Sequence, residues 1–136
     1  MDAPALLRAL ADATERRDGT AFAAHFTEDA VYHDVFYGAF AGRAKIAAMI
    51  DDWFYRTARD FRWDFLEPVG DGRTLYARYL FSYVSLLPEA EGRRAMFEGV
   101  AILTLRDGRI ATYREVANPG PGFTDMKFAP ARIAPR

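Results

Sequence analysis

Four runs between Phe61 and Val116 alternate between apolar and polar residues, and turn signals separate them. Asp71-Gly72 and Asp107-Gly108 are typical of tight hairpin turns, and Pro88 to Gly92 forms a third break. Consecutive strands joined by such turns form a meander, and strands of this length must twist and curl. The predicted strands run from Phe61 to Pro68, from Thr74 to Leu87, from Ala95 to Leu105 and from Ile110 to Val116.

The first half of the chain shows mainly helical spacing. The recurring apolar residues Ile46, Met49, Ile50, Trp53 and Phe54 predict a long amphipathic helix from Arg43 to Arg59. Before it we expect a helix from Pro4 that Gly19 ends, a short helix capped by Thr20 that continues through His25 or Phe26, a strand from Ala30 to Val35, and a loop between Gly38 and Gly42. Helices followed by a meander indicate an α+β fold in which the helices cover one face of the sheet.

Composition excludes several classes of protein. The net charge is −1 and the basic residues are scattered, so no nucleic-acid partner is expected. The absence of cysteine excludes disulfides, thiol nucleophiles and thiolate metal sites. The start of the chain lacks a basic region followed by an apolar run, and no apolar stretch approaches membrane-spanning length. We therefore expect a cytoplasmic protein without a membrane partner.

Three short segments resemble the nuclear transport factor 2-like superfamily, which includes the SnoaL-like proteins: the run Phe26-Thr27-Glu28-Asp29-Ala30-Val31-Tyr32, the helix start Gly42-Arg43, and the turn Asp107-Gly108-Arg109-Ile110. The resemblance implies a cone-shaped, curved antiparallel sheet wrapped around N-terminal helices and one long helix, a cystatin-like α+β barrel with one deep pocket. It covers a domain of residues 1–118, and a Pro/Gly-rich tail of residues 119–136 follows. This scaffold hosts enzymes, binding modules and assembly domains.

The resemblance also implies roles for single residues. Asp34 lies where ketosteroid isomerase, a member of the superfamily, has its catalytic base, but Leu10 and Ala101 replace the two groups that hold its oxyanion. Leu80 replaces an aspartate that limonene epoxide hydrolase needs beside the counterpart of Arg78. Neither route is therefore expected. The SnoaL-type cyclases use an acidic residue on a late strand, and Glu115 is its counterpart.

Strand alternation predicts which side chains face the pocket. With Asp34 pointing inward, the expected pocket is an aromatic chamber that holds the two carboxylates of Asp34 and Glu115. Its expected ligand-binding residues are Tyr32, Tyr79, Phe81, Tyr83, Phe97 and Tyr113, with Met49 and Trp53 of the long helix closing it. A shift of one residue in the strand that begins at Thr74 would instead turn Arg78, Leu80 and Ser82 inward.

Each candidate catalytic residue has a structural alternative. Asp34 is either a catalytic carboxylate or a strand-end group that accepts hydrogen bonds from the next loop. Glu115 is either a desolvated acid or base or the partner of Arg78 or Arg114. The two histidines have no third ligand at suitable spacing, so no metal site is predicted. No cofactor motif is present, so no cofactor is expected.

Three functions are consistent with this pattern: a cofactor-free isomerase, lyase or cyclase acting on a small hydrophobic, oxygenated molecule, a ligand-binding domain without catalysis, and an assembly module with a solid core. A pocket below about 100 Å³ would remove the first two, because ligand pockets usually measure roughly 300–1,000 Å³. The opposite sheet face mixes apolar and charged residues, and this pattern predicts a homodimer. That face carries Arg78, Leu80, Val84, Glu98, Val100, Ile102 and Arg114.

Overall fold

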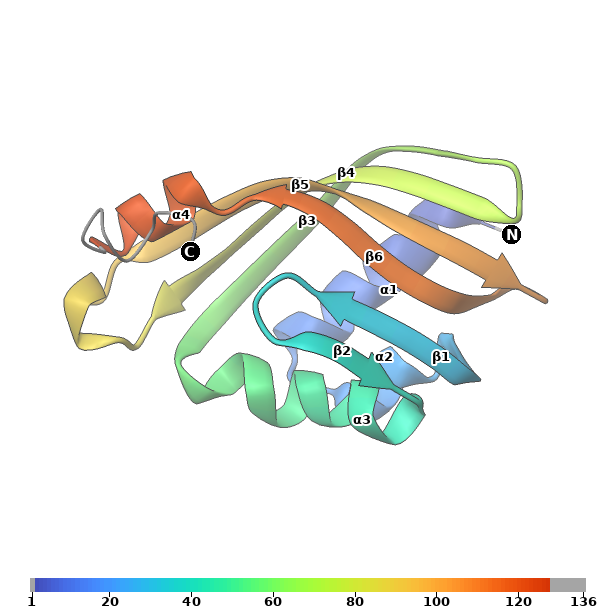
Figure 1. Cartoon of the computed structure of the whole chain (residues 1–136), viewed down its shortest axis with the longest axis horizontal. Coiled ribbons are helices and arrows are strands. Elements are labelled where there is room, and N and C mark those ends of the chain that lie inside the picture. Colours follow the sequence, from blue (N-terminus) through green and yellow to red (C-terminus); the bar gives the residue numbers. More distant parts are fainter. Residues whose placement is uncertain (1, 128–136) are drawn as a thin grey trace.

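A computed structural model describes residues 2–127, in which six strands form one curved sheet with helices against its concave face (Figure 1). The helices are α1 (Ala3–Glu15), α2 (Gly19–Ala23), α3 (Arg43–Ala48), η1 (Met49–Trp53), η2 (Phe54–Arg56), η3 (Pro88–Ala90) and α4 (Gly120–Asp125). The strands are β1 (Phe26–Asp34), β2 (Gly38–Ala41), β3 (Ala58–Gly70), β4 (Thr74–Ser85), β5 (Arg94–Arg106) and β6 (Arg109–Asn118). The α+β prediction is confirmed. No helix within residues 2–127 is long and apolar enough to cross a membrane.

The predicted meander is present, since β3, β4, β5 and β6 pair with their neighbours in antiparallel fashion. The strand order in the whole sheet is β2-β1-β6-β5-β4-β3. One part of the prediction is wrong: the sheet is mixed, because β1 runs parallel to β6. After β2 the chain passes through the helical segment and then through β3, β4 and β5. It then returns as β6, which lies beside β1 and runs in the same direction as β1.

The segment from Gly38 to Gly42, predicted as a loop, contains strand β2. It pairs with β1 from Asp34↔Gly38 to Val31↔Ala41. Two glycines and two alanines in five residues carry almost no strand propensity, so pairing with β1 sets this conformation. The β1–β2 hairpin leaves a short connecting loop, Val35 to Tyr37, at the end of β1.

The long helical segment starts at Arg43 as predicted and ends at Arg56, three residues earlier than expected. Its middle, Met49–Trp53, is a π-helix, in which each turn holds more residues than an α-turn. The wider turn changes the phase of the residues that follow. Phe54 is therefore buried against the sheet, where it contacts Phe61 and Phe81.

The short helix α2 starts two residues earlier than predicted and ends at Ala23. Asp18 rather than Thr20 is the N-cap, and its carboxylate accepts a hydrogen bond from the Ala21 amide at 3.0 Å. Gly19 is the first residue of this helix. A Cβ at this position would lie 2.2 Å from the Ala47 carbonyl oxygen of α3, so a larger residue would not fit there. The close packing of α2 on α3 thus requires the glycine that the sequence pattern suggested as a helix breaker.

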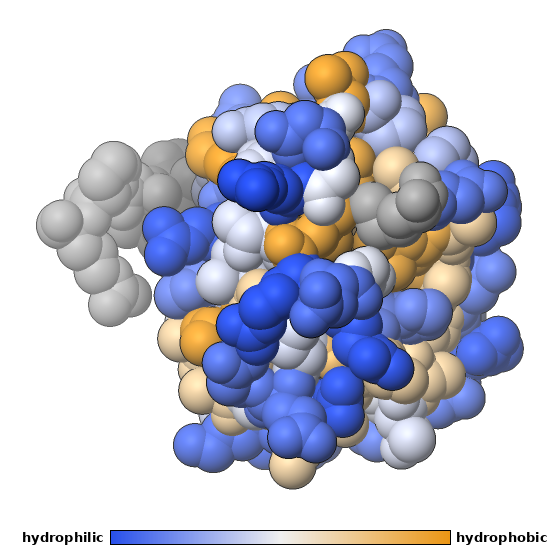
Figure 2. All heavy atoms as spheres, turned by 90° about the vertical axis from the view of Figure 1, so that its right-hand side faces the viewer, coloured by the Kyte–Doolittle hydropathy of each residue, from blue (hydrophilic) through white to orange (hydrophobic). Residues whose placement is uncertain are grey.

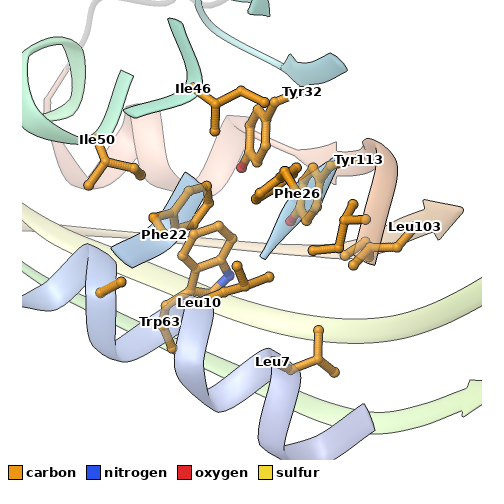
Figure 3. Close-up of a cluster of buried hydrophobic side chains, with 14 of the residues drawn as sticks. Leu7, Leu10, Phe22, Phe26, Tyr32, Ile46, Ile50, Trp63, Leu103 and Tyr113 are labelled. Atoms are coloured by element: carbon orange, nitrogen blue, oxygen red, sulfur yellow. The ribbon is translucent and has the colours of Figure 1, made fainter. Parts of the chain in front are cut away.

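The core lies between the concave sheet face and α1, α2 and α3. Figure 3 shows Phe22, Phe26, Tyr32 and Tyr113 gathered above Trp63, with Leu7 and Leu10 of α1 closing the layer from below. The rings of Tyr32 and Tyr113 stack with centroids 4.2 Å apart and an interplanar angle of 4°. This pair ties β1 to β6 at their last paired position, Tyr32↔Tyr113.

The described part of the C-terminal tail packs on the sheet. Helix α4 lies along β5 (Figure 1), and Met126 is buried in a small cluster with Ala90, Ala95 and Phe97. Phe123 contacts Phe97 edge-on at 6.0 Å. Phe128, which the sequence also suggested as a packing residue, lies outside the described residues.

The packing of α4 predicts different effects for two glycine substitutions in the same helix. A Cβ at Gly122 would lie 2.1 Å from the Phe97 ring, whereas one at Gly120 would meet only the Asn118 side chain at 3.5 Å. Gly122→Ala should lower the free energy of unfolding by about 1–3 kcal/mol, as overpacking does. Gly120→Ala should leave it within about 0.5 kcal/mol. Urea unfolding of both variants measures this, and equal stabilities would contradict the packing of α4 on Phe97.

Candidate functional site

The cavity at the open end of the cone is small, about 40 Å³. It lies between the ends of β1 and β6, the beginnings of β3 and β5, and the second half of β4. Its walls consist of Tyr32, Asp34, Val35, Phe36, Tyr37, Phe54, Thr57, Ala58, Phe61, Trp63, Tyr79, Phe81, Tyr83, Phe97, Glu115 and Ala117. The other end of the molecule, beyond the β5–β6 turn, carries mainly hydrophilic side chains and an ion pair between Asp29 and Arg106 (Figure 2).

Glu115 brings a carboxylate to the inner face of β6. Its Oε2 accepts a hydrogen bond from the Val35 amide at 3.2 Å, and its Oε1 lies 3.5 Å from the Tyr113 hydroxyl, which donates to it. The Tyr79 hydroxyl also donates to this carboxylate. Burial, and secondarily the charge of Asp34, raises the pKa of Glu115 to about 7, although these hydrogen bonds oppose the rise.

Asp34 closes β1 on the same cavity. Its Oδ2 accepts hydrogen bonds from the amides of Phe36 at 2.9 Å and Tyr37 at 3.0 Å. Burial raises the pKa of Asp34, and the two amide hydrogen bonds act against this rise. Asp34 therefore has the structural role of accepting hydrogen bonds from the next loop, and it also lines the cavity.

The phenols of the cavity stay protonated. Burial raises the pKa of Tyr79 and of Tyr83 well above the ordinary value, so both hydroxyls are hydrogen-bond donors at neutral pH. The Tyr79 hydroxyl reaches Glu115 because residue 99 is a glycine. A Cβ at Gly99 would lie only 2.6 Å from the Tyr79 hydroxyl oxygen. The Tyr83 hydroxyl has a weaker partner, the Met126 sulfur at 3.9 Å.

The predicted alternative partner of Glu115 lies elsewhere. Arg78 is on the outer face of the sheet, where it approaches Glu67 at 3.5 Å and Glu98 at 3.6 Å. The cavity walls within residues 2–127 contain no lysine, arginine or histidine. The charge of Asp34 thus acts on Glu115 without a cation from this lining to offset it, and this favours the protonated form of Glu115.

Both carboxylates also line a shallow groove on the outside of the sheet, together with His33, Val35 and Arg114. The groove exists because the parallel pairing of β1 and β6 stops at Tyr32↔Tyr113, so the strands separate at Asp34 and Glu115. Solvent therefore reaches the neighbourhood of the two carboxylates from the outer face as well.

The structure brings together most of the residues predicted for the site: Asp34, Glu115, Tyr32, Tyr79, Phe81, Tyr83 and Phe97 all lie on the cavity wall. Tyr113 stands behind Tyr32 in the core. Met49 and Trp53 do not line the cavity. Met49 is fully buried in the main core instead. Trp53, at the end of the π-turn, packs against Tyr37 and Phe40.

Several lining residues were not predicted. Phe61 and Trp63 belong to the alternating pattern of β3, so extending the inward and outward assignment to that strand would have found them. Phe54 depends on the π-turn, which has no periodic signature. Phe36 and Tyr37 lie in a loop whose backbone amides donate hydrogen bonds to Asp34, just before the loop, and to Glu115, far along the chain. The loop's own sequence does not reveal these partners.

Residues 7–113 match the family model of the SnoaL-like domain. The chain belongs to the SnoaL-like family. This confirms the resemblance to the nuclear transport factor 2-like superfamily that the sequence suggested. A search among curated proteins finds no match.

Solved structures share this SnoaL-like fold at low sequence identity. A Mycobacterium tuberculosis LEH-like epoxide hydrolase is 18% identical with a TM-score of 0.72, and the alignment covers 91% of this chain and 88% of the other. A protein of ketosteroid isomerase-like fold from Catenulispora acidiphila DSM 44928 is 14% identical with a TM-score of 0.79, covering 95% and 100%. A candidate polyketide cyclase from Xanthomonas campestris is 23% identical with a TM-score of 0.72, covering 90% and 94%. These likenesses show the fold alone.

The raised pKa of Glu115 predicts how stability depends on pH. Between its ordinary value of 4.5 and about 7, the folded state binds the proton more tightly than the unfolded state, so the free energy of unfolding falls as pH rises through this window. Each pKa unit corresponds to about 1.4 kcal/mol, which limits the effect to about 3 kcal/mol.

Glu115→Gln removes this titration and retains an oxygen acceptor for the Val35 amide. The variant should be more stable than the parent at pH 8, and the difference should shrink toward pH 5. Urea unfolding at several pH values between 5 and 8 measures it. A constant difference between the two proteins across this range would contradict the raised pKa.

Proposed function

We propose that this SnoaL-like protein binds a small, flat, hydrophobic molecule with a carbonyl or hydroxyl oxygen and moves a proton on it without a cofactor. The observation that carries the proposal is the Glu115 carboxyl, buried in an aromatic cavity whose lining supplies no cation, with a pKa of about 7. A general acid or base works best when its pKa lies near the operating pH. The reaction class is that of an isomerase, lyase or cyclase.

The groups around Glu115 have distinct roles in such a reaction. Ionised Glu115 accepts a proton from a carbon next to the substrate carbonyl and returns it to another atom of the same molecule. Within residues 2–127 the Tyr83 hydroxyl has the weak Met126 sulfur as its hydrogen-bond partner, and it can exchange this partner for the oxygen on which negative charge develops. Asp34 disfavours ionisation of Glu115 through its charge and thereby keeps Glu115 a competent proton donor in the return step.

Two routes of related proteins lack support in this chain. Leu10 and Ala101 are fully buried apolar residues, so they supply no oxyanion donor of the steroid isomerase type. Arg78 is engaged with carboxylates on the outer sheet face, away from the cavity lining, so it supplies no epoxide-hydrolase centre.

The size of the cavity favours a second candidate function. A volume of about 40 Å³ holds roughly three water molecules, below the range of ligand pockets. Taken alone, this supports an assembly module with a nearly solid interior. The arrangement of two desolvated carboxylates and several phenols favours the ligand-binding proposal, because a solid core is more stable with apolar residues at such positions.

Catalysis is tested with 2-tetralone, a flat bicyclic ketone, in D₂O at pD 7.5. The protein should accelerate hydrogen–deuterium exchange at the carbon next to the carbonyl, followed by proton NMR. Glu115→Gln should lower the acceleration by about 10²–10⁴-fold, the usual contribution of a positioned acid or base. Binding of 2-naphthol, measured by its fluorescence, should change only a few-fold.

Glu98→Gln, on the outer sheet face, is the control and should exchange like the parent. Absence of acceleration by the parent protein with intact 2-naphthol binding leaves a binding domain. Absence of both supports the assembly module and overturns the proposal.

We also propose that the protein forms a homodimer through the outer sheet face. Large apolar side chains are exposed there beside the charged pair Arg78–Glu98, which suits a self-complementary surface. The exposed apolar residues are Tyr76, Met96, Val100 and Val116.

The dimer proposal predicts that Val100→Lys yields a monomer, because the substitution buries an unpaired charge at the interface. Leu86→Lys, at an exposed position after β4, is the control and should remain dimeric. Light scattering after size exclusion measures both masses. A monomeric parent protein at 100 µM or more, or a dimeric Val100→Lys, would contradict this interface.

A further inference from the structure

We propose that the loop Val35–Tyr37 is a gate over the cavity, and that ionised Glu115 latches it shut. This inference deepens the proposed function, because it names the element that must move for a ligand to enter. The gate opens when Glu115 takes up a proton or exchanges the loop amide for a ligand.

The first observation is the lack of room. The closed cavity measures about 40 Å³, yet its wall includes eight aromatic side chains besides the two in the loop. A bicyclic ligand needs several times this volume. Rigid strands β4, β5 and β6 form one side of the cavity, and their ladders are continuous there from Ala77↔Ala101 to Tyr83↔Ala95. The loop is the part of the wall that can move at the smallest cost.

The second observation is the way the loop covers the cavity. Phe36 reaches Phe97 with ring centroids 5.3 Å apart and Phe123 at 5.7 Å, while Tyr37 reaches Trp53 at 5.6 Å. Both loop rings are nevertheless 40% exposed. Phe36 thus bridges the cavity to Phe97 of β5, whereas Tyr37 packs on Trp53 outside the lining and forms a side-chain hydrogen bond with Thr57. Such contacts can break and re-form while the rest of the fold stays intact.

The third observation separates the two carboxylates. Asp34 is the last residue of β1, and its bonds to the amides of Phe36 and Tyr37 hold the loop to the end of its own strand. The bond from the Val35 amide to Glu115 instead links the loop to β6, a residue 80 positions later in the chain. Asp34 therefore shapes the loop at the end of β1, and Glu115 provides the bond that joins the loop to the neighbouring strand β6.

The latch responds to charge because a carboxylate accepts a hydrogen bond more strongly than a neutral carboxyl does. The titratable groups that face Glu115 are Asp34 and the Tyr32 phenol from β1, the Tyr79 hydroxyl from β4 and the Tyr113 hydroxyl from its own strand. His33 and Arg114 line the outer groove beside it. Burial of Glu115 places its titration near neutral pH, so the gate is sensitive in this range.

Amide hydrogen exchange of the full chain tests the gate without any ligand or turnover. After correction for the intrinsic exchange rate, protection of the Val35 amide should fall about tenfold or more from pH 8 to pH 5.5, as expected for weakening one charge-assisted hydrogen bond. Glu115→Gln should show weaker protection that does not change over this range, and Glu115→Ala should show the weakest. Glu98→Gln, on the outer face, should keep the parent profile.

Protection of Val35 that is independent of pH in the parent, or unchanged in Glu115→Ala, would overturn the gate. A second readout uses the rate of 2-naphthol binding: Phe36→Ala should bind about tenfold faster than the parent, because one bridge of the closed loop is gone. An equal rate in both proteins counts against the loop as the entrance. If the Val35 amide shows the expected dependence on pH but the protein does not accelerate deuterium exchange into 2-tetralone, the gate stands and the proposed catalysis is overturned.

Discussion

The arrangement of the site depends on where the parallel pairing of β1 and β6 stops. The stacked rings of Tyr32 and Tyr113, 4.2 Å apart, mark the last paired position, and beyond it the two strands diverge. Asp34 and Glu115 each lie two residues past this pair, on the same face as the rings. The stack thus fixes the two carboxylates beside one cavity, and the divergence of the strands opens the outer groove that brings solvent close to them.

Desolvation gives these carboxylates their chemical character. A lining composed mainly of aromatic rings removes water without offering a positive charge, so burial is the largest cause of the raised pKa of both Asp34 and Glu115. Hydrogen bonds from phenols and loop amides limit this rise. The balance leaves Glu115 near neutrality, where one proton is gained or lost at small cost. The same balance would be lost if Arg78 faced inward, and the register of β4 with β5 keeps it on the outer face, beside Glu67 and Glu98.

Much of this arrangement follows from local patterns in the sequence. Period-two alternation and the turns at Asp71-Gly72 and Asp107-Gly108 predict the meander, and with it the shared cavity wall of Tyr79, Phe81, Tyr83, Phe97 and Glu115. The features that escape prediction are set by contacts between distant segments. The π-turn places Phe54 rather than Trp53 at the cavity, and β2 depends on pairing with β1. Neither leaves a periodic trace in its own residues.

The position of the loop Val35–Tyr37 also could not be predicted from local sequence patterns, and this loop is the element on which the proposed function depends. Its sequence, two large apolar groups and a tyrosine, reads locally as the end of a strand, but its backbone amides are held by side chains of β1 and β6. A cavity nearly filled by its own rings gains nothing from a catalytic group unless an element yields to a ligand. Because Glu115 holds that element and also faces the cavity, any ligand that engages Glu115 weakens the closed state that excludes it. In the proposed reaction, ligand entry and proton transfer compete for one carboxylate, and its protonation state sets which of the two is favoured.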